Sequence, residues 1–385
     1  MARAKKGANA LSSSSTEATT QLRLFELLDA SDSDYSNTVE LYDALPKYVW
    51  SISEQEISKN RVINRAFKSR GVTYALKIKP AVVERKKGDE VESVMLYPGP
   101  REEIIEEVLR KLAVQGNLGV AENGDVNSPV GVYFTVNQLR KELARTNHTY
   151  SAREVLEALD VMSSSLLEVS TGRGSDKDAY RGNLLSSLAL RTRKDYLEDG
   201  SAKCFATFHP LVQHAIRTQQ FRMYDYSTSM KIRSDLGRYM FKRMSHYWVQ
   251  ASPDHPYQFK LISFLESSPR GLSPQMKDNM RAIRQALTAL AEQDVILPTW
   301  TETMIKNPQD RRKTDDVAYE VFPTEAFRKQ TMRANRKQNI VNGRVSISDA
   351  RQAINDQSDK PQDEDVEHVD DAGNIFVDDD HQPDY

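Results

Sequence analysis

The chain has 385 residues, which is long enough for two domains plus tails. Charged residues make up 28% of it, and no stretch approaches the roughly 20 apolar residues that span a bilayer, so we expect no membrane partner. Cys204 is the single cysteine, which excludes an internal disulfide and a cysteine-rich metal site and fits a cytoplasmic location.

The net charge of −2 hides an asymmetry between the body of the chain and its end. Residues 361–385 contain ten acidic residues and neither Lys nor Arg. Removing these ten leaves 53 basic against 45 acidic side chains, a net charge of +8 for residues 1–360. A basic body suits a polyanionic partner such as DNA. The C-terminal segment 336–385 is predicted to be a disordered acidic tail.

The N-terminal arm, residues 1–44, is polar and rich in Ser, and is predicted to be disordered. Within it lies one apolar pentapeptide, Gln21-Leu-Arg-Leu-Phe25. Leu22, Leu24 and Phe25 have no core of their own, so they are exposed unless a partner covers them. The segment is either the start of a small docking helix or a linear motif. As a motif, QLxLF resembles the peptide that bacterial replication proteins insert into the sliding clamp.

Residues 45–220 are predicted to form a first winged-helix domain with a hairpin in front of it. Strand and helix patterns place its elements at 73–83, 91–97, 101–115, 132–134, 136–144, from 151 onward, 166–170 and 184–193. Ser151 with Glu154 three residues later is a capping box that opens a helix. On the helix 101–115 we expect four glutamates to face water: Glu102, Glu103, Glu106 and Glu107.

Residues 221–335 repeat this order of elements without repeating the sequence, and are predicted to form a second winged-helix domain. Ser234 is expected to cap a helix that runs to Val249. A further helix is predicted for 273–292, with Ser273 as N-cap and Pro274 at the first helical position. Strands at 295–298 and 317–322 flank a polar, basic tip, the wing. The predicted fold class is therefore α+β, with two tandem winged-helix domains between a disordered arm and tail.

The helix 273–292 is the candidate for reading DNA. Its apolar residues recur at helical spacing, and its basic residues share another face, which suits a helix held by a core on one side and by a DNA groove on the other. In the first domain, acidic Glu154, Glu157 and Asp160 would repel phosphates, so only the wing there is expected to make contacts, either with the DNA backbone or in a dimer. The predicted contacts are Lys277, Arg281, Arg284, Thr288, Lys306, Arg311, Arg312, Lys313, Arg173, Lys177 and Arg181. A solvated surface helix would show the same pattern.

Three runs together resemble the TrfA-type plasmid replication initiators. They are Gln21-Leu-Arg-Leu-Phe25, Arg233-Ser-Asp-Leu-Gly-Arg-Tyr-Met-Phe241 and Pro256-Tyr-Gln-Phe-Lys-Leu-Ile-Ser-Phe264. The resemblance covers about residues 20–300 in order of elements, and the acidic tail falls outside it. It implies binding to direct repeats in a double-stranded plasmid origin, and recruitment of the initiator DnaA, the replicative helicase and the sliding clamp. It also implies homodimers, and assigns Gln21, Leu22, Leu24 and Phe25 to the clamp.

The inventory of reactive groups argues against catalysis. No glycine is followed by lysine, so a Walker A phosphate loop is excluded. The seven histidines include no His-apolar-His pair of the kind that rolling-circle nickases use. We therefore expect no catalytic residue, no cofactor and no metal site. Two other readings fit the fold and charge: a winged-helix transcription regulator, and a non-catalytic scaffold that joins replication proteins.

Overall fold

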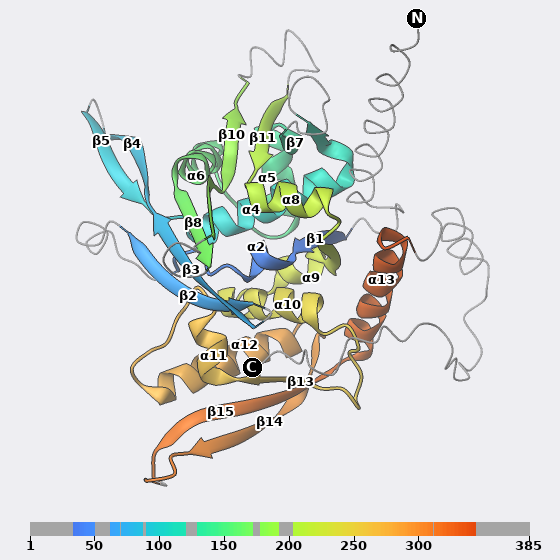
Figure 1. The fold of residues 1–385 in the computed structure, drawn as a ribbon. Helices are drawn as coiled ribbons and strands as arrows, with labels where there is room; N and C mark the ends of the chain where they lie inside the picture. Colours follow the sequence, from blue (N-terminus) through green and yellow to red (C-terminus); the bar gives the residue numbers. More distant parts are fainter. Residues whose placement is uncertain are drawn as a thin grey trace, which may run out of the picture.

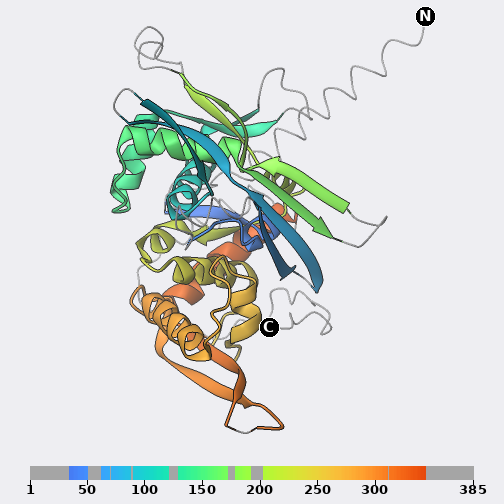
Figure 2. The same ribbon diagram turned by 90° about the vertical axis from the view of Figure 1, so that its left-hand side faces the viewer.

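The structure is a computed structural model that describes residues 34–50, 62–69, 71–87, 90–120, 129–171, 178–191, 203–310 and 312–343. The predicted clamp peptide, residues 21–25, and the last part of the tail, residues 344–385, lie outside these ranges. Helices and strands are mixed throughout, which confirms the α+β class (Figure 1). Two units lie one above the other, and a long hairpin projects from the lower one (Figure 2). No helix in the described ranges is both long and apolar enough to cross a bilayer.

The first unit is built mainly from two antiparallel four-stranded sheets and the α-helices α4, α5, α6 and α8. Their orders are β2-β3-β8-β9 and β10-β11-β7-β6, and β4 pairs separately with β5. The bounds are β2 Ile63–Ser69, β3 Val72–Lys79, β4 Ala81–Lys87, β5 Glu90–Leu96, α4 Pro100–Leu112, the π-helical turn Ala113–Asn117, β6 Leu118–Val120, β7 Val130–Phe134, α5 Val136–Arg145, α6 Ala152–Ser164, β8 Leu166–Thr171, β9 Asp178–Asn183, β10 Leu185–Ala189, β11 Cys204–Phe208 and α8 Pro210–Arg217.

The capping box predicted for the first unit is confirmed at the start of α6. The Ser151 hydroxyl accepts from the Glu154 amide, and the Glu154 carboxylate accepts from the Ser151 amide. The strand prediction for 184–193 needs correction. The partner of β8 in the wing is β9, with Leu166 opposite Asn183, whereas β10 pairs with β11 in the other sheet. The sequence pattern missed β9 because its residues, DAYRGN, hold one aromatic residue and no aliphatic alternation.

The second unit has the connectivity of a winged helix, in which one strand lies between the first two helices and a hairpin follows the third. Its sheet has the order β13-β15-β14. The bounds are α10 Asp235–Tyr247, β13 Tyr257–Lys260, α11 Leu261–Glu266, α12 Met276–Ala291, β14 Ile296–Lys306, β15 Thr314–Pro323 and α13 Glu325–Val341. Ser234 caps α10 as predicted, with its hydroxyl accepting from the Gly237 amide at 3.1 Å. That helix ends at Tyr247 rather than Val249.

A two-stranded sheet lies where the two units meet, and it uses a segment from the predicted disordered arm. Strand β1 (Tyr35–Val39), followed by α2 (Glu40–Ala44), pairs antiparallel with β12 (Phe221–Asp225), which α9 (Tyr226–Lys231) follows. Helix α13 packs against β12 from the other end of the chain. The predicted disorder of 1–44 and 336–385 is therefore wrong for residues 35–44 and 336–341. Both segments are too short of apolar residues to show an independent core, and they become ordered by packing on β12.

The prediction that the α4 glutamates face water is also wrong. Glu102, Glu103, Glu106 and Glu107 are each exposed by 4% or less. Arg110, on the same helix, forms a two-pronged ion pair with Asp43 at 2.7 and 2.8 Å. Acidic residues at helical spacing are usual on a solvated face, so the pattern alone could not indicate that cations from other elements would cover them.

The cation that covers α4 comes from the second unit. Lys242 of α10 lies 2.9 Å from Glu107 and 3.4 Å from Glu103, and it is 7% exposed. Tyr224 of β12 also donates to Glu107, and Trp50 donates to Glu103 at 3.1 Å. Burial alone would lower the pKa of Lys242, but the two carboxylates outweigh burial and raise it above its usual value. A layer of buried, hydrogen-bonded charges, which we call the α4–α10 charge layer, thus joins the two units.

Candidate nucleic-acid interface

Helix α12 presents the two faces that the sequence predicted. Ile283, Ala286, Leu287 and Leu290 are buried, all at 0% exposure. The opposite side is exposed and carries the predicted DNA contacts of this helix, Lys277, Arg281, Arg284 and Thr288. The helix packs on α10 and on β14, so the sheet and the first helix of the unit fix its outward orientation. The structure therefore brings these four residues together on one surface.

The start of α12 differs from the prediction. The helix begins at Met276, with Gln275 and not Ser273 at the N-cap position. Asn279, which is 3% exposed, holds the preceding turn from inside. Its side chain accepts from the Ser273 amide and donates to the Ser273 carbonyl, both at 2.8 Å. A buried Asn that closes a turn six residues earlier is a tertiary feature, which the cap preferences of Ser273 and Pro274 did not reveal.

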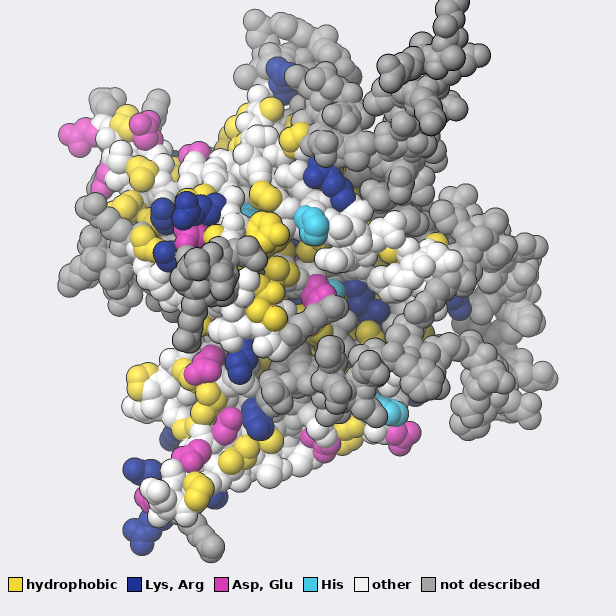
Figure 3. All heavy atoms as spheres, in the orientation of Figure 1, with side chains coloured by type: hydrophobic (Ala, Val, Ile, Leu, Met, Phe, Trp, Pro, Cys, Tyr) yellow, Lys and Arg dark blue, Asp and Glu magenta, His cyan; other side chains and the backbone are white. Residues whose placement is uncertain are grey.

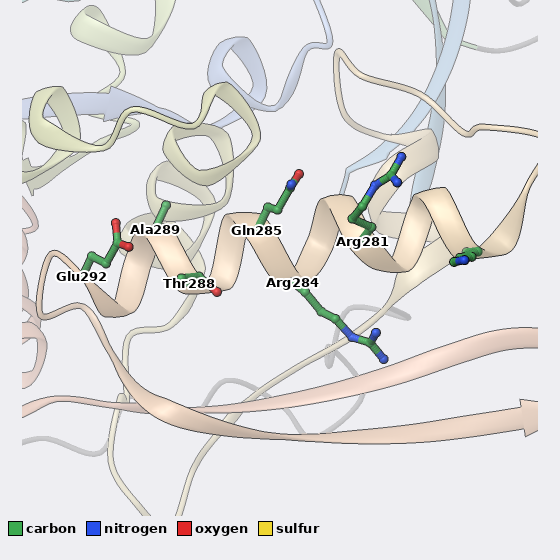
Figure 4. A pocket seen from close by; sticks show the side chains of 7 residues that line it. Arg281, Arg284, Gln285, Thr288, Ala289 and Glu292 are labelled. Atoms are coloured by element: carbon green, nitrogen blue, oxygen red, sulfur yellow. The ribbon is translucent and has the colours of Figure 1, made fainter.

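A shallow groove of about 420 Å³ runs along the exposed face of α12 (Figure 4). It is lined by Lys277, Arg281, Arg284, Gln285, Thr288, Ala289 and Glu292. These side chains include hydrogen-bond donors and acceptors of the kinds that contact base edges in a major groove. Arg281 also forms an ion pair with Asp278 at 2.8 Å, with 65% of the Arg281 side chain exposed, so its charge remains accessible.

Arg284 has an acidic partner on the wing, which its place on the basic face of α12 did not indicate. Glu302 of β14 accepts from Arg284 Nε at 2.9 and 3.2 Å and from Nη2 at 2.6 Å. In Figure 4 Arg284 points from α12 toward the hairpin strands, whereas Arg281 and Gln285 point away from these strands. The hydrogen bonds that Arg284 donates to Glu302 are the main cause of the raised pKa of Arg284, and the same bonds lower the pKa of Glu302. Both groups are therefore charged at neutral pH.

The wing is much longer than the predicted strands at 295–298 and 317–322. Strand β14 lies at the edge of its sheet, where it pairs with β15, and most of its side chains are exposed. Lys306, Arg312 and Lys313 are exposed at or near the tip, where basic side chains gather in Figure 3. The Asn307 side chain closes the turn by accepting from the amides of Gln309 and Asp310 at 2.8 and 3.0 Å. Arg311 lies outside the described residues.

The first unit offers less to DNA. Of its three predicted contacts, Arg173 and Lys177 lie outside the described residues. Arg181 is described on β9, where it forms an ion pair with the nearly buried Glu168 at 2.9 Å. Glu157 of α6 does not simply face solvent, as we expected, because Arg85 of β4 and Arg101 each lie 2.9 Å from it. The β4–β5 hairpin therefore covers part of the acidic face of α6.

No cluster of three or more His, Cys, Asp or Glu side chains with the geometry to hold a metal ion occurs within the described ranges. Cys204 is buried in β11, as its apolar neighbours predicted, and its sulfur accepts from the Arg191 amide at 3.3 Å. Glu302, the acidic partner of Arg284, is not among the residues predicted from the sequence. Only the period-two placement of Trp300 and Glu302 on one face of a strand could have indicated it.

Comparisons with known proteins give likeness of structure only. The sequence matches no family model and none of the curated proteins. A crystal structure of domains 2 and 3 of RctB is similar over 77% of this chain and 99% of that one, with a TM-score of 0.43 and 12% identity. A selenomethionine derivative of the same domains covers 73% and 96%, also with a TM-score of 0.43 and 12% identity. A crystal structure of the Pi initiator protein in complex with iteron DNA covers 58% and 91%, with a TM-score of 0.39 and 13% identity.

Proposed function

We propose that this protein is a plasmid replication initiator that binds direct repeats of its origin through α12 and the β14–β15 hairpin. The observation that carries the proposal is the exposed basic face of α12 beside a long hairpin with Lys306, Arg312 and Lys313 near its tip. A helix of about 10–12 Å diameter fits the major groove, and a projecting basic hairpin can reach the adjacent phosphates. Base contacts then specify the repeat and phosphate contacts fix the register.

The proposal assigns no catalysis to the chain. Opening of the origin would be driven by binding energy or by a partner ATPase. Recruitment of DnaA, of the replicative helicase and of the sliding clamp, and the formation of a homodimer, are proposed on the sequence resemblance to TrfA-type initiators. The helix and hairpin support the DNA-binding part alone.

The hairpin tip tests the phosphate-binding role. Changing Lys306→Gln and Lys313→Gln together should weaken binding on the order of tenfold at 100 mM salt, equally for selected and for mixed-sequence duplexes. Two lost phosphate contacts should also make the slope of log K against log [salt] shallower by about 1.8. Fluorescence anisotropy across a salt series measures both quantities. The matched control is Arg328→Gln with Lys329→Gln on α13, which removes the same charge far from the tip. Loss confined to the selected duplex would contradict a phosphate role.

The clamp peptide needs a separate test, because it lies outside the described residues. Leu24→Ala with Phe25→Ala should abolish capture of a purified bacterial sliding clamp by the full chain, while DNA binding stays unchanged. Leu27→Ala with Leu28→Ala is the control, because a docking helix would include these residues whereas the QLxLF motif does not. Equal losses for both pairs would favour the docking helix, and undiminished capture by the first pair would remove the clamp assignment.

A further inference from the structure

An ion pair between Arg284 and Glu302 joins α12 to the wing. Trp300 and Glu302 lie two residues apart on β14 and therefore on the same face of the strand. The Trp300 indole N–H donates to Glu302 Oε1 at 3.0 Å, and Arg284 binds both oxygens of the same carboxylate. Glu302 is only 17% exposed, whereas 49% of the Arg284 side chain is exposed. The carboxylate is thus held from two sides, and the guanidinium reaches the surface.

The contact with Glu302 occupies one edge of the Arg284 guanidinium and leaves another edge available to donate hydrogen bonds. Nε and Nη2 donate to Glu302. The end formed by Nη1 and the second hydrogen of Nη2 has no acceptor among the residues that the structure describes. That end has the fork geometry that donates to O6 and N7 of a guanine. Without a partner, a long arginine side chain on a DNA-facing helix would be free to turn toward a phosphate instead.

We propose that Glu302 is a positioning residue for sequence discrimination, a role that rests on the proposed DNA-binding function. It holds Arg284 by the Nε–Nη2 edge so that the opposite end is presented to a guanine. Because the carboxylate binds the Nε–Nη2 edge, it also offsets the attraction of Arg284 for phosphates. Glu302 therefore lowers affinity for DNA in general and preserves the preference for the repeat.

The test uses the full chain with Glu302→Gln, which keeps the shape and the acceptor for Trp300 but removes the charge. Two duplexes of 30 base pairs serve as probes: one of mixed sequence, and one enriched by the wild-type protein from a library with a randomised centre. We expect Glu302→Gln to bind the mixed duplex about fivefold to tenfold more tightly at 100 mM salt, because one phosphate contact is gained. The salt slope should steepen by about 0.9, and the preference for the enriched duplex should fall by a similar factor.

Glu320→Gln is the matched control. Glu320 lies on β15 one residue beyond Tyr319, the cross-strand partner of Glu302, so it points to the other face of the hairpin, where it accepts from Gln258 at 2.8 Å. It makes the same charge change without touching Arg284, and should alter binding by less than twofold. In the Arg284→Gln background, Glu302→Gln should lose its effect, because the carboxylate acts through Arg284.

The possible failures are distinguishable. If the wild-type protein binds neither duplex, the proposed function fails and this inference fails with it. If the wild-type protein binds but Glu302→Gln behaves like Glu320→Gln, the inference alone is overturned. An effect of Glu302→Gln that persists in the Arg284→Gln background also overturns it, because general repulsion of DNA by the carboxylate would then suffice.

Discussion

Replacing Lys242 by methionine is expected to lower the free energy of unfolding by about 3–5 kcal/mol. The substitution keeps most of the side-chain volume, but it leaves Glu103 and Glu107 buried without their cation from α10. A buried carboxylate that loses its cation costs more than the pair contributes, because it has no water to replace that partner. After the substitution Glu103 keeps the hydrogen bond from Trp50, and Glu107 keeps its ion pair with Arg110. Denaturant unfolding at pH 7, followed by tryptophan fluorescence and circular dichroism, measures the loss.

The pH dependence separates this mechanism from a packing defect. Burial raises the pKa of Glu107, but Arg110 and Lys242 outweigh burial and lower it to about 2. In the wild type the Glu107 carboxylate contributes stability at pH values above its pKa in the unfolded state, and this contribution is lost as the pH falls toward 2. In Lys242→Met the Glu107 carboxylate loses one of the two cations that lower its pKa and protonates more easily, so the difference in stability from the wild type should shrink between pH 7 and pH 4.

Lys329→Met is the control, because its ion pair with Glu325 is exposed and 3.8 Å long. It should change stability by less than about 0.5 kcal/mol. A pH-independent loss in Lys242→Met would point to packing rather than charge.

Replacing Arg284 by alanine is expected to reduce affinity for the enriched duplex by about 5- to 150-fold, the worth of one bidentate contact to guanine. Affinity for the mixed duplex should fall much less, because that complex relies on phosphate contacts. Anisotropy titrations with the two duplexes at one salt concentration measure the difference directly. A loss that is equal on both would show that α12 does not read bases through Arg284.

Arg328→Ala provides the comparison for this result. Arg328 is also exposed and also paired with a glutamate, Glu325 at 3.1 Å, but it lies on α13. It should leave both affinities unchanged. Unfolding curves for Arg284→Ala should match those of the wild type, because the side chain is about half exposed and its partner Glu302 can regain water.

The parts of the fold that could be predicted from sequence are those set by neighbouring residues. The capping box at Ser151, the apolar stripe of α12 and the cap of α10 by Ser234 depend on local spacing, and the structure confirms them. In the second unit the wing strands β14 and β15 are consecutive in the sequence and pair with each other, so a local pattern could indicate that hairpin. In the first unit β8 pairs with β3 across a long stretch of chain, and sequence patterns carry no signal for such pairing.

What could not be predicted depends on partners distant in sequence. The glutamates of α4 have the spacing of a solvated helix face. That this face is covered becomes evident only from the contact of Lys242 with Glu107 and of Asp43 with Arg110. In the sequence Glu302 is one acidic residue of a predicted hairpin, and only the structure shows that it pairs with Arg284. The predicted basic face of α12 was correct in position, but two of its charges are paired. Arg284 pairs with Glu302 on β14, and Arg281 pairs with Asp278, three residues earlier on the same helix.

The α4–α10 charge layer also limits how this protein can be taken apart. A fragment ending near residue 220 would keep Glu103 and Glu107 while losing the Lys242 ammonium group that pairs with both and the Tyr224 hydroxyl that donates to Glu107. A fragment starting there would lose β1, the only strand paired with β12 in the described part of the chain. Neither half is therefore a faithful stand-in for the intact chain, and footprints measured on isolated halves would report on altered molecules.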